Sequence, residues 1–329
     1  MENYVPLVNE YRGKTLDLIH LGYLSAVDMN GKIILNAGDP NAIVYYRSAS
    51  KPVQALPTIA RHLDEKFGLT DEESVIFSAS HAGEKFHISA LESILKKTGL
   101  KEEMLIMKPA VPAYAPANEE RIREGIPPRK LYHNCAGKHL SLLLLQRELG
   151  GELTDYYKNE SLAQMEILRT IKEVGETDTV ELGIDGCGVT VFAVPVRSIA
   201  TAFLNLAHPE KINDEALSNA AKRFIPRIHE YPRMIRGTNY ICSILNMDPN
   251  IVAKGGANGV YGFALKKEGI GVSFKLIDGT QDCWPLIIKT VLQRLSALSD
   301  ETRERIDLLS PEIITNDNDI VVGERRIAF

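Results

Sequence analysis

Apolar residues recur at intervals of three or four along several long stretches of the chain, with polar residues between them. This spacing places the apolar side chains on one face of a helix and the polar side chains on the other. In several stretches a glycine marks the end of the pattern, as it does at many helix C-termini. The pattern predicts helices over residues 87–99, 137–151, 160–176, 212–228 and 285–299.

Shorter apolar runs next to glycine have the length and composition of strands. The segment 18–40 contains two such runs joined at Asn30-Gly31, a dipeptide that tolerates the positive φ angles of a tight hairpin. The fold class expected from these elements is α/β, with an antiparallel sheet flanked by helices and built from strands near the start, middle and end of the chain. Further strands are predicted over 188–196, 259–265, 271–278 and 325–329, and the apolar piece 74–77 is strand-like.

Composition narrows the class of protein. The 329 residues are 44% hydrophobic and 25% charged, as in an ordinary globular protein, and can bury a large core. A net charge of -5 and the lack of a block of Lys and Arg argue against nucleic-acid binding. The start of the chain is not typical of a secretory signal, and no apolar run is long enough to cross a membrane, so a cytoplasmic protein without a membrane partner is expected.

The stretch "YYRSASKPVQALP" contains the first candidate chemistry. Ser48 and Lys51 are three positions apart, so in a helical turn the amine lies within reach of the hydroxyl. A serine hydroxyl needs a base to become a nucleophile, and a lysine serves as one only when burial or nearby cations lower its pKa; Arg47 is such a cation. Pro52 biases Lys51 away from helical backbone angles. The alternative is a simple helix cap at Ser48 or Ser50, with a solvated lysine.

Two other segments offer similar groups and similar alternatives. "SASHAGE" contains Ser80, which could relay a proton, and His81; the alternative is a polar surface turn. "AKGGANG" places Lys254 before two glycines that allow a ligand to approach closely; the alternative is a glycine-rich hairpin turn. Neither "GIDGCG" nor "KGGANG" has the glycine order of a dinucleotide-binding motif, and "AGKHLS" is not a phosphate-binding loop.

The cysteines suggest a metal only weakly. The four cysteines are too few and too scattered for a disulfide framework, so reduced thiols are expected. Cys135 and Lys138 lie at the start of an apolar helix, and Cys187 lies between glycines. Because no C-x-x-C pair exists, spacing alone favours buried small side chains over a zinc site.

Taken together and in order, the motifs "RSASKPVQALP", "SASHAGE", "HNCAGKH", "GIDGCGV" and "AKGGANGVYG" resemble the L-asparaginase family of the inducible, thermolabile rhizobial type. The similarity runs from about Ile19 to the C-terminal strand. The resemblance implies a single catalytic domain over residues 1–329 with a helical subdomain near 85–180. It also implies a fold like that of serine β-lactamases and glutaminases, and a homodimer.

The resemblance assigns roles by position. It implies two Ser-Lys tandems, Ser48 with Lys51 and Ser80 with Lys254, as the catalytic groups. Asp185 is expected to hold the substrate α-amino group, and Asn258 departs from an expected acidic residue. The residues implied to bind substrate are Arg47, His81, His139, Asp185 and Gly256. A Zn²⁺ site is implied at Cys135, Lys138 and Cys187.

The implied reaction is hydrolysis of L-asparagine to L-aspartate and ammonia through an acyl-enzyme. Lys51 is expected to activate Ser48 as the nucleophile, and Ser80 and Lys254 to pass a proton to the leaving amine, with Ser80 as the alternative nucleophile. Three alternatives remain at this stage: a glutaminase, a β-lactamase or penicillin-binding protein, and a non-catalytic zinc-dependent binding protein.

Overall fold

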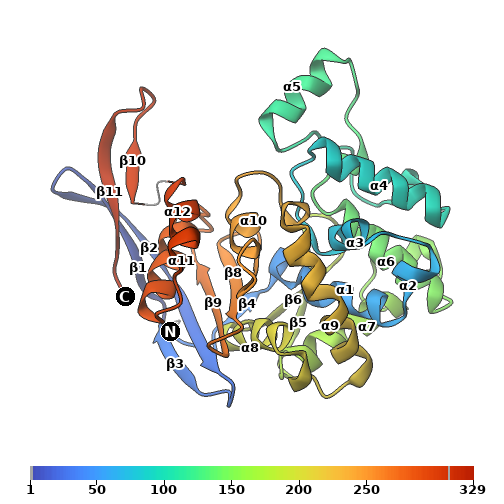
Figure 1. The fold of residues 1–329 in the computed structure, drawn as a ribbon, viewed down its shortest axis with the longest axis horizontal. Coiled ribbons are helices and arrows are strands. Elements are labelled where there is room, and N and C mark those ends of the chain that lie inside the picture. Colours follow the sequence, from blue (N-terminus) through green and yellow to red (C-terminus); the bar gives the residue numbers. More distant parts are fainter. Residues whose placement is uncertain (1–2, 310–311) are drawn as a thin grey trace.

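An antiparallel sheet occupies one side of the protein, seen in the computed structural model of Figure 1, which describes residues 3–309 and 312–329. The strand order is β10-β11-β1-β2-β9-β8-β7, with β3 paired to β2, so the first and last strands of the chain pair with each other near the β10 edge. The α/β class with an antiparallel sheet flanked by helices is confirmed. The strands are β1 (Val5–Arg12), β2 (Thr15–Asp28), β3 (Ile33–Ala37), β7 (Ile251–Gly255), β8 (Val260–Leu265), β9 (Ile270–Leu276), β10 (Ile313–Thr315) and β11 (Val321–Ile327).

Helices cover both faces of this sheet. Ser273 and Phe274 are consecutive on β9, so their side chains point to opposite faces. The Ser273 hydroxyl donates a 2.6 Å hydrogen bond to the carbonyl of Val196, the first residue of α8 (Val196–Ala207). Phe274 stacks on Tyr261, whose ring meets Trp284 of α11 (Trp284–Arg294) at 5.0 Å. The sheet is therefore held between α8 and α11.

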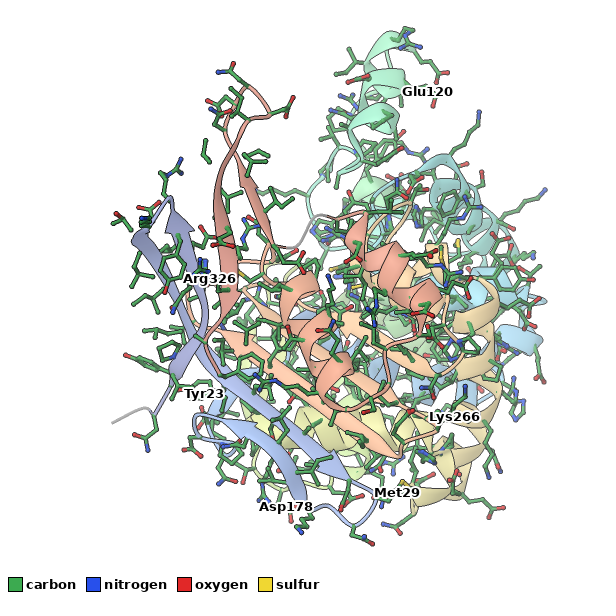
Figure 2. All side chains as sticks on the ribbon, turned by 60° about the vertical axis from the view of Figure 1, so that its left-hand side comes forward. Tyr23, Met29, Glu120, Asp178, Lys266 and Arg326 are labelled. Atoms are coloured by element: carbon green, nitrogen blue, oxygen red, sulfur yellow. The ribbon has the colours of Figure 1, made fainter. Side chains whose placement is uncertain are left out.

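The rest of the chain is mainly helical: α8 packs on one face of the sheet, and the turn η1 (Arg47–Ser50) and helix α10 (Ile241–Asn246) lie against the edge strand β7. A small second sheet, β4-β6-β5, lies within this part. Figure 2 shows how far the surface elements spread: Glu120 lies on the projecting helix α5, while Met29 follows strand β2 and Arg326 lies on β11. The elements are β4 (Ile43–Tyr45), β5 (Glu181–Ile184), β6 (Thr190–Pro195), α1 (Lys51–Ala60), α2 (Leu63–Lys66), α3 (Asp71–Val75), α4 (Lys85–Thr98), α5 (Ala115–Arg123), α6 (Ala136–Glu148), α7 (Leu162–Val174), α9 (Glu215–Glu230), α10 (Ile241–Asn246) and α12 (Asp300–Asp307).

Most of the elements predicted from periodicity are confirmed. The hairpin at Asn30-Gly31 is the β2–β3 connection, where Gly31 has a φ of 75°. The predicted helices correspond to α4, α6, α7, α9 and α11, and the four predicted strands to β6, β8, β9 and β11. Helix α11 stops at Arg294, before Ser296 with a φ of 54°, and a separate helix α12 follows. None of the helices in the described part of the chain is long and apolar enough to cross a membrane.

Two local predictions were wrong. The strand-like piece 74–77 belongs to helix α3 and the 3-10 turn η2 (Ile76–Ser78), because Thr70 and Glu73 form a reciprocal capping box that starts a helix there. Lys51 has helical angles (φ -58°, ψ -37°) in spite of Pro52, which lies in the first turn of α1, the part of a helix that tolerates proline. Helix α1 also continues through Pro57 to Ala60.

Candidate active site

The hydroxyl of Ser80 lies between two lysine amines. Nζ of Lys51 and Nζ of Lys254 each donate a 3.0 Å hydrogen bond to Oγ of Ser80. Lys51 is the first residue of α1, Ser80 follows η2 in an extended segment, and Lys254 lies on the edge strand β7. Three segments distant in sequence therefore meet at one hydroxyl group.

Backbone carbonyls hold both amines in place. Lys51 also donates to the carbonyl of Ala79 at 2.7 Å, and Lys254 to that of Gly255 at 2.6 Å. The two lysines are almost completely buried, at 0% and 1% exposure. Within the described part of the chain no carboxylate forms an ion pair with either lysine. These amines are thus surrounded by dipoles that do not neutralise a positive charge.

This environment favours neutral amines. Burial lowers the pKa of Lys254 to about 7, and the charges of Lys51 and Arg236 contribute to the decrease. Burial also lowers the pKa of Lys51, and the charge of Lys138 acts in the same direction, although the negative charge of Cys135 opposes it. A lysine that loses its proton near neutral pH can act as a general base toward a neighbouring hydroxyl.

Ser48 lies on the same small cavity as Ser80 but is not bonded to Lys51. It belongs to the 3-10 turn η1 (Arg47–Ser50) that precedes α1 and is half-buried. Among the described residues, the side-chain hydrogen bonds of Lys51 go to Ser80 and to carbonyls, so the expected Ser48–Lys51 contact is replaced by a Ser80–Lys51 contact. The cavity has a volume of about 80 Å³ and is lined by Ser48, Ser80, Asn134, Arg236, Cys242, Lys254, Gly255, Gly256, Ala257, Gln281 and Trp284.

The two serines differ in what their surroundings allow. Ser80 is 6% exposed, and its backbone N–H donates to the carbonyl of Ile235 at 2.9 Å, so that N–H is not free to hold an oxyanion. Ser50, expected as a helix cap, uses its hydroxyl to donate to the carbonyl of Arg47 and caps no N–H of α1. Ser48 is therefore the more open hydroxyl, and Ser80 the one that both lysines contact.

Gly256 brings strand β7 close to the turn that carries Ser48. A Cβ at this position would lie 2.9 Å from the backbone N of Ala49 and 3.1 Å from the carbonyl O of Tyr46. Only glycine fits this approach. Asn258 has a φ of 57° in the β7–β8 turn, a conformation that asparagine tolerates, so its place in the sequence has a backbone reason.

A second polar cluster adjoins the lysine pair through Cys135, which follows Asn134. Nζ of Lys138 donates to Sγ of Cys187 at 3.2 Å and lies 4.0 Å from a carboxylate oxygen of Asp185. All three predicted metal ligands are buried and belong to this cluster. The structure thus brings together Cys135, Lys138 and Cys187 with Asp185.

The side chains of this cluster have pKa values shifted in different directions. A hydrogen bond from Cys187 lowers the pKa of Cys135 well below its ordinary value, with help from the charges of Lys51 and Lys138. The same hydrogen bond and burial raise the pKa of Cys187. Burial alone would lower the pKa of Lys138, but both sulfurs and Asp185 outweigh it and raise that pKa. The pKa directions therefore favour a thiolate at Cys135, a thiol at Cys187 and an ammonium group at Lys138.

Arg47 connects this cluster with the turn that carries Ser48. Its guanidinium pairs with Asp185 at 2.9 Å, although its backbone has a φ of 49°, which is strained for a residue with a Cβ. Strain of this kind costs about 1–3 kcal/mol and persists where the surroundings enforce it. The ion pair accordingly fixes the residue that directly precedes Ser48.

The two histidines predicted to bind substrate lie elsewhere. His81 and His139 are both 0% exposed and are not among the residues lining the cavity. Nδ1 of His139 is 2.7 Å from the hydroxyl of Tyr156, and burial lowers the pKa of both histidines well below the ordinary value. In this structure both rings are buried outside the lining of the cavity.

Sequence reasoning missed several residues of the cavity. Arg236 donates to the carbonyl of Ser80 at 2.7 Å and lies over the ring of Tyr240, yet no motif surrounds it. Trp284 is the only tryptophan of the chain, which is the one signal that could have drawn attention to it. Asn134 lies inside a motif already singled out, but nothing in the motif distinguished it.

Comparison with known proteins gives one match in sequence. A family model described as L-asparaginase II matches residues 8–327. No curated protein matches the chain. The matched range contains the cavity and the cysteine cluster.

Comparison with solved structures gives distant similarities. A protein from Bacteroides dorei provisionally named a β-lactamase has 11% identity and a TM-score of 0.47, over 84% of this chain and 93% of its own. A β-lactamase from Mycobacterium bovis has 12% identity and a TM-score of 0.42, over 83% and 94%. A glutaminase from Bacillus has 12% identity and a TM-score of 0.38, over 84% and 91%. At such scores these structures add nothing to the assignment of residues.

Proposed function

Since the chain belongs to the L-asparaginase II family, we propose that it is an L-asparaginase that uses serine and lysine side chains to hydrolyse the side-chain amide of L-asparagine. The observation that carries this proposal is the placement of Ser80 between two buried lysines, with Ser48 on the same cavity. A buried amine with a pKa near 7 can exchange protons with a hydroxyl at neutral pH, as amide hydrolysis requires.

In the proposed reaction Ser48 is the nucleophile. Its Oγ attacks the carboxamide carbon, and its proton passes to the neutral amine of Lys51. Because Ser48 and Lys51 are not hydrogen-bonded in this structure, this step requires the Ser48 hydroxyl to approach the amine when substrate binds. The tetrahedral intermediate collapses to an ester of Ser48, and a proton delivered from Lys254 through Ser80 allows ammonia to leave. Water then attacks the ester, and its proton passes through Ser80 to the now neutral Lys254. Lys51 returns its proton to the oxygen of Ser48 as aspartate leaves, so both lysines recover their starting protonation. Two features support Ser48: its partial exposure, and the engagement of the Ser80 N–H with Ile235.

Ser80 is the second candidate for the nucleophile, because both lysine amines contact its hydroxyl directly. A proton could leave Ser80 for either lysine without any rearrangement. The ester intermediate distinguishes the two candidates. Rapid acid quenching during turnover, followed by peptide mass spectrometry, identifies whether the aspartyl group is attached to the peptide containing Ser48 or to that containing Ser80.

We also propose that Cys135, Cys187 and Lys138 hold Zn²⁺. The donor set fits, because two sulfurs and an amine are already in contact, one sulfur favours the thiolate form, and a carboxylate lies nearby. Lys138 must lose a proton to bind, so the metal replaces a positive charge that the cluster already stabilises. A bound zinc ion would supply a fixed positive charge close to Asp185 and Arg47. In the proposal, Asp185 receives the substrate α-amino group.

The proposed function is tested by measuring ammonia release from L-asparagine and L-glutamine, with hydrolysis of a β-lactam measured in parallel and each assay repeated with added zinc. We expect turnover of asparagine, with glutamine slower and the β-lactam not hydrolysed. Lys85→Ala, an exposed change on α4 outside the cavity, controls for handling and is expected to remain active. Binding of asparagine without ammonia release under all conditions would overturn the enzymatic assignment.

A further inference from the structure

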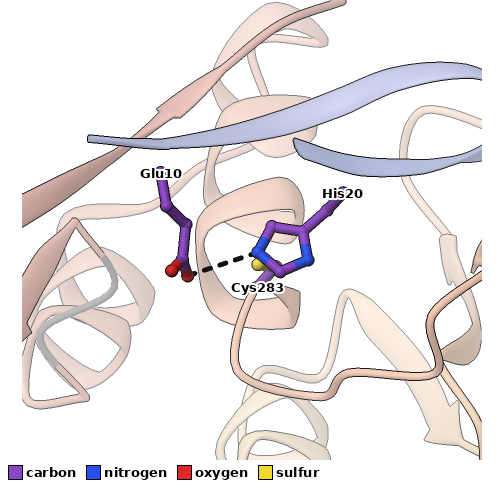
Figure 3. A group of neighbouring side chains, drawn as sticks. All are labelled: Glu10, His20 and Cys283. Carbon is purple, nitrogen blue, oxygen red and sulfur yellow. Dashed lines mark ion pairs between the residues drawn. The ribbon is translucent and has the colours of Figure 1, made fainter. Parts of the chain in front are cut away.

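Another group of metal-binding side chains lies at the N-terminal end of α11, outside the cavity (Figure 3). Glu10 of β1, His20 of β2 and Cys283, which directly precedes α11, each offer one ligand atom, and these atoms lie within 4.8 Å of one another. Elements from the two ends of the chain therefore bring an oxygen, a nitrogen and a sulfur to one place.

Asp278 fixes the orientation of the His20 ring. Its carboxylate lies 2.5 Å from Nδ1 of His20, a ring that is 3% exposed. When Nδ1 carries the hydrogen and donates it to a carboxylate, the lone pair of the neutral ring is on Nε2. Metal-binding histidines almost always have their second nitrogen held in this way.

The other ring nitrogen of His20 is buried without a hydrogen-bond partner among the described residues. Nε2 lies 3.2 Å from Oε1 of Glu10, but the geometry is not that of a hydrogen bond. A protonated ring bridging Asp278 and Glu10 would require an aligned N–H on this side. The poor alignment between Nε2 and Glu10 is instead compatible with a lone pair on Nε2. Without a bound metal ion, this buried nitrogen has no hydrogen-bond partner in the described part of the chain, which is rare for a buried polar atom.

The surroundings of Cys283 are rich in negative charge. The thiol is 0% exposed, and burial raises its pKa to about 12. The charges that act on it are the carboxylates of Glu10, Asp278 and Asp282, and one guanidinium, that of Arg325, which bonds Oε1 of Glu10 at 2.8 Å. Because three of these charges are carboxylates and one is a cation, the surroundings of the Cys283 thiol favour binding of an additional positive charge.

We propose that Glu10, His20 and Cys283 bind a divalent transition-metal ion of the zinc class, with Asp278 as the residue that orients His20. Zinc takes this combination of carboxylate, imidazole and thiolate, with ligand atoms about 2.0–2.3 Å from the metal. Ligand atoms around such an ion lie about 3.5 Å apart, so the group contracts slightly on binding. Binding replaces the thiol proton of Cys283 and leaves a fourth position for water.

Such an ion would act as a structural clamp. It would tie β1 and β2 to the loop that leads into α11, and two residues of that region, Gln281 and Trp284, line the cavity that contains Ser48 and Ser80. The inference does not depend on the proposed hydrolysis, because it rests on residues outside that cavity. It can therefore fail or succeed independently of the asparaginase assignment.

The test uses Co²⁺ as the probe, because a cobalt–thiolate bond gives a charge-transfer absorption band. The starting variant is Cys135→Ser/Cys187→Ser, which removes both sulfurs of the other proposed site. We expect one equivalent of Co²⁺ to bind with a charge-transfer band that Cys283→Ser abolishes in this background. Asp278→Asn should weaken binding about 10- to 100-fold while keeping the band. Cys242→Ser is the matched control for loss of a buried thiol and should retain the band.

A second measurement covers the case in which the multiple variants fail to fold. The unmodified chain loaded with ¹¹³Cd²⁺ should show two cadmium resonances, one typical of two sulfur ligands and one of a single sulfur ligand. His20→Ala should remove only the single-sulfur resonance. A single resonance of the two-sulfur type, or a charge-transfer band that survives Cys283→Ser, would overturn the proposal.

Discussion

The hydroxyl of Ser80 and the amine of Lys254 lie 3.0 Å apart although 174 positions separate them in the sequence. The contact forms because Lys254 is on the edge strand of the large sheet and Ser80 is in the extended segment after η2, where the helical part meets that edge. Lys254 is buried without a carboxylate in contact, so its position has an energetic cost that a purely structural lysine would avoid.

Replacing Lys254 with Met should stabilise the protein at low pH while removing its activity. The pKa of Lys254 is about 7 in the folded protein and 10.5 when the side chain is not buried. Between pH 7 and pH 10.5 the unfolded chain therefore holds a proton on Lys254 that the folded protein has lost, and stability rises with pH. The cost of burial is full below pH 7 and decreases as the pH rises toward 10.5. We expect Lys254→Met to raise the free energy of unfolding by roughly a few kcal/mol at pH 6.

Urea unfolding of both proteins at pH 6 and at pH 9.5 measures this effect. The difference between Lys254→Met and the unaltered protein should shrink at the higher pH. Lys275→Met is a useful comparison, because that lysine is only partly buried and should show a smaller change. An equal difference at both pH values would mean that Lys254 has an ordinary pKa in the folded state.

The two serines should differ in the step that their loss affects. Ser48→Ala removes the proposed nucleophile, so kcat should fall by at least about 10³-fold with no ester intermediate. Ser80→Ala interrupts the proton path between the lysines and should lower kcat by about 10²–10⁴-fold while the ester at Ser48 still forms. Quenched-flow measurement of aspartate bound to the protein separates the two results. Full activity in Ser48→Ala would contradict its role as the nucleophile.

Much of the fold could be predicted from the sequence, because periodicity is a local property. Helices α4, α6, α7, α9 and α11 follow from apolar spacing, and the β2–β3 hairpin from its turn residues. The piece 74–77 was predicted wrongly because the capping box that starts its helix lies upstream, at Thr70 and Glu73, and outweighs an apolar run of ambiguous type.

The site was less predictable, because its contacts depend on tertiary structure. Spacing suggested Lys51 as the partner of Ser48, but α1 directs that amine toward Ser80 of another segment. The cysteine cluster could be assembled only through the family resemblance, since Cys135 and Cys187 are far apart in sequence. Arg236 and its hydrogen bond to the carbonyl of Ser80 had no signal in the sequence at all.

Replacing Arg47 with Gly should separate backbone strain from catalytic positioning. Glycine adopts a φ near 49° without strain, so the free energy of unfolding should change by less than about 1 kcal/mol, the relief offsetting the lost ion pair with Asp185. Activity should fall at least about 10-fold, mainly through a higher KM, because the ion pair that fixes the position of Asp185 and of the turn carrying Ser48 is lost. Ser296→Gly, with a φ of 54° between α11 and α12, is the matched control and should keep full activity. Unchanged KM in Arg47→Gly would show that the ion pair does not position the site.

Binding of zinc at the cysteine cluster should release about two protons at pH 7.5. Cys187 and Lys138 have raised pKa values, which favour their protonated forms in the metal-free cluster, whereas the lowered pKa of Cys135 favours its thiolate. Calorimetric titration in buffers with different ionisation enthalpies counts the protons. Lys138→Met should release about one proton fewer and bind zinc more weakly. Equal proton release by both proteins would exclude Lys138 as a ligand. The background Cys283→Ser removes any contribution from the group at Glu10 and His20.

Replacing Gly137 with Ala should disrupt the site through the backbone alone. Gly137 lies in α6 directly before Lys138, and a Cβ there would be 2.0 Å from the carbonyl oxygen of Ile76 in η2. The clash can be relieved only if the backbone of α6 or of η2 moves, and η2 leads directly to Ser80. We therefore expect the free energy of unfolding to fall by about 3 kcal/mol or more, and kcat to be lower in the folded fraction. Gly186→Ala is the control, because nothing lies within 4 Å of its added Cβ, and its stability should change by less than about 0.5 kcal/mol. Denaturant unfolding compares the two variants. Equal midpoints would mean that α6 and η2 can separate freely, and the spacing between the cysteine cluster and Ser80 would then not be set by this glycine.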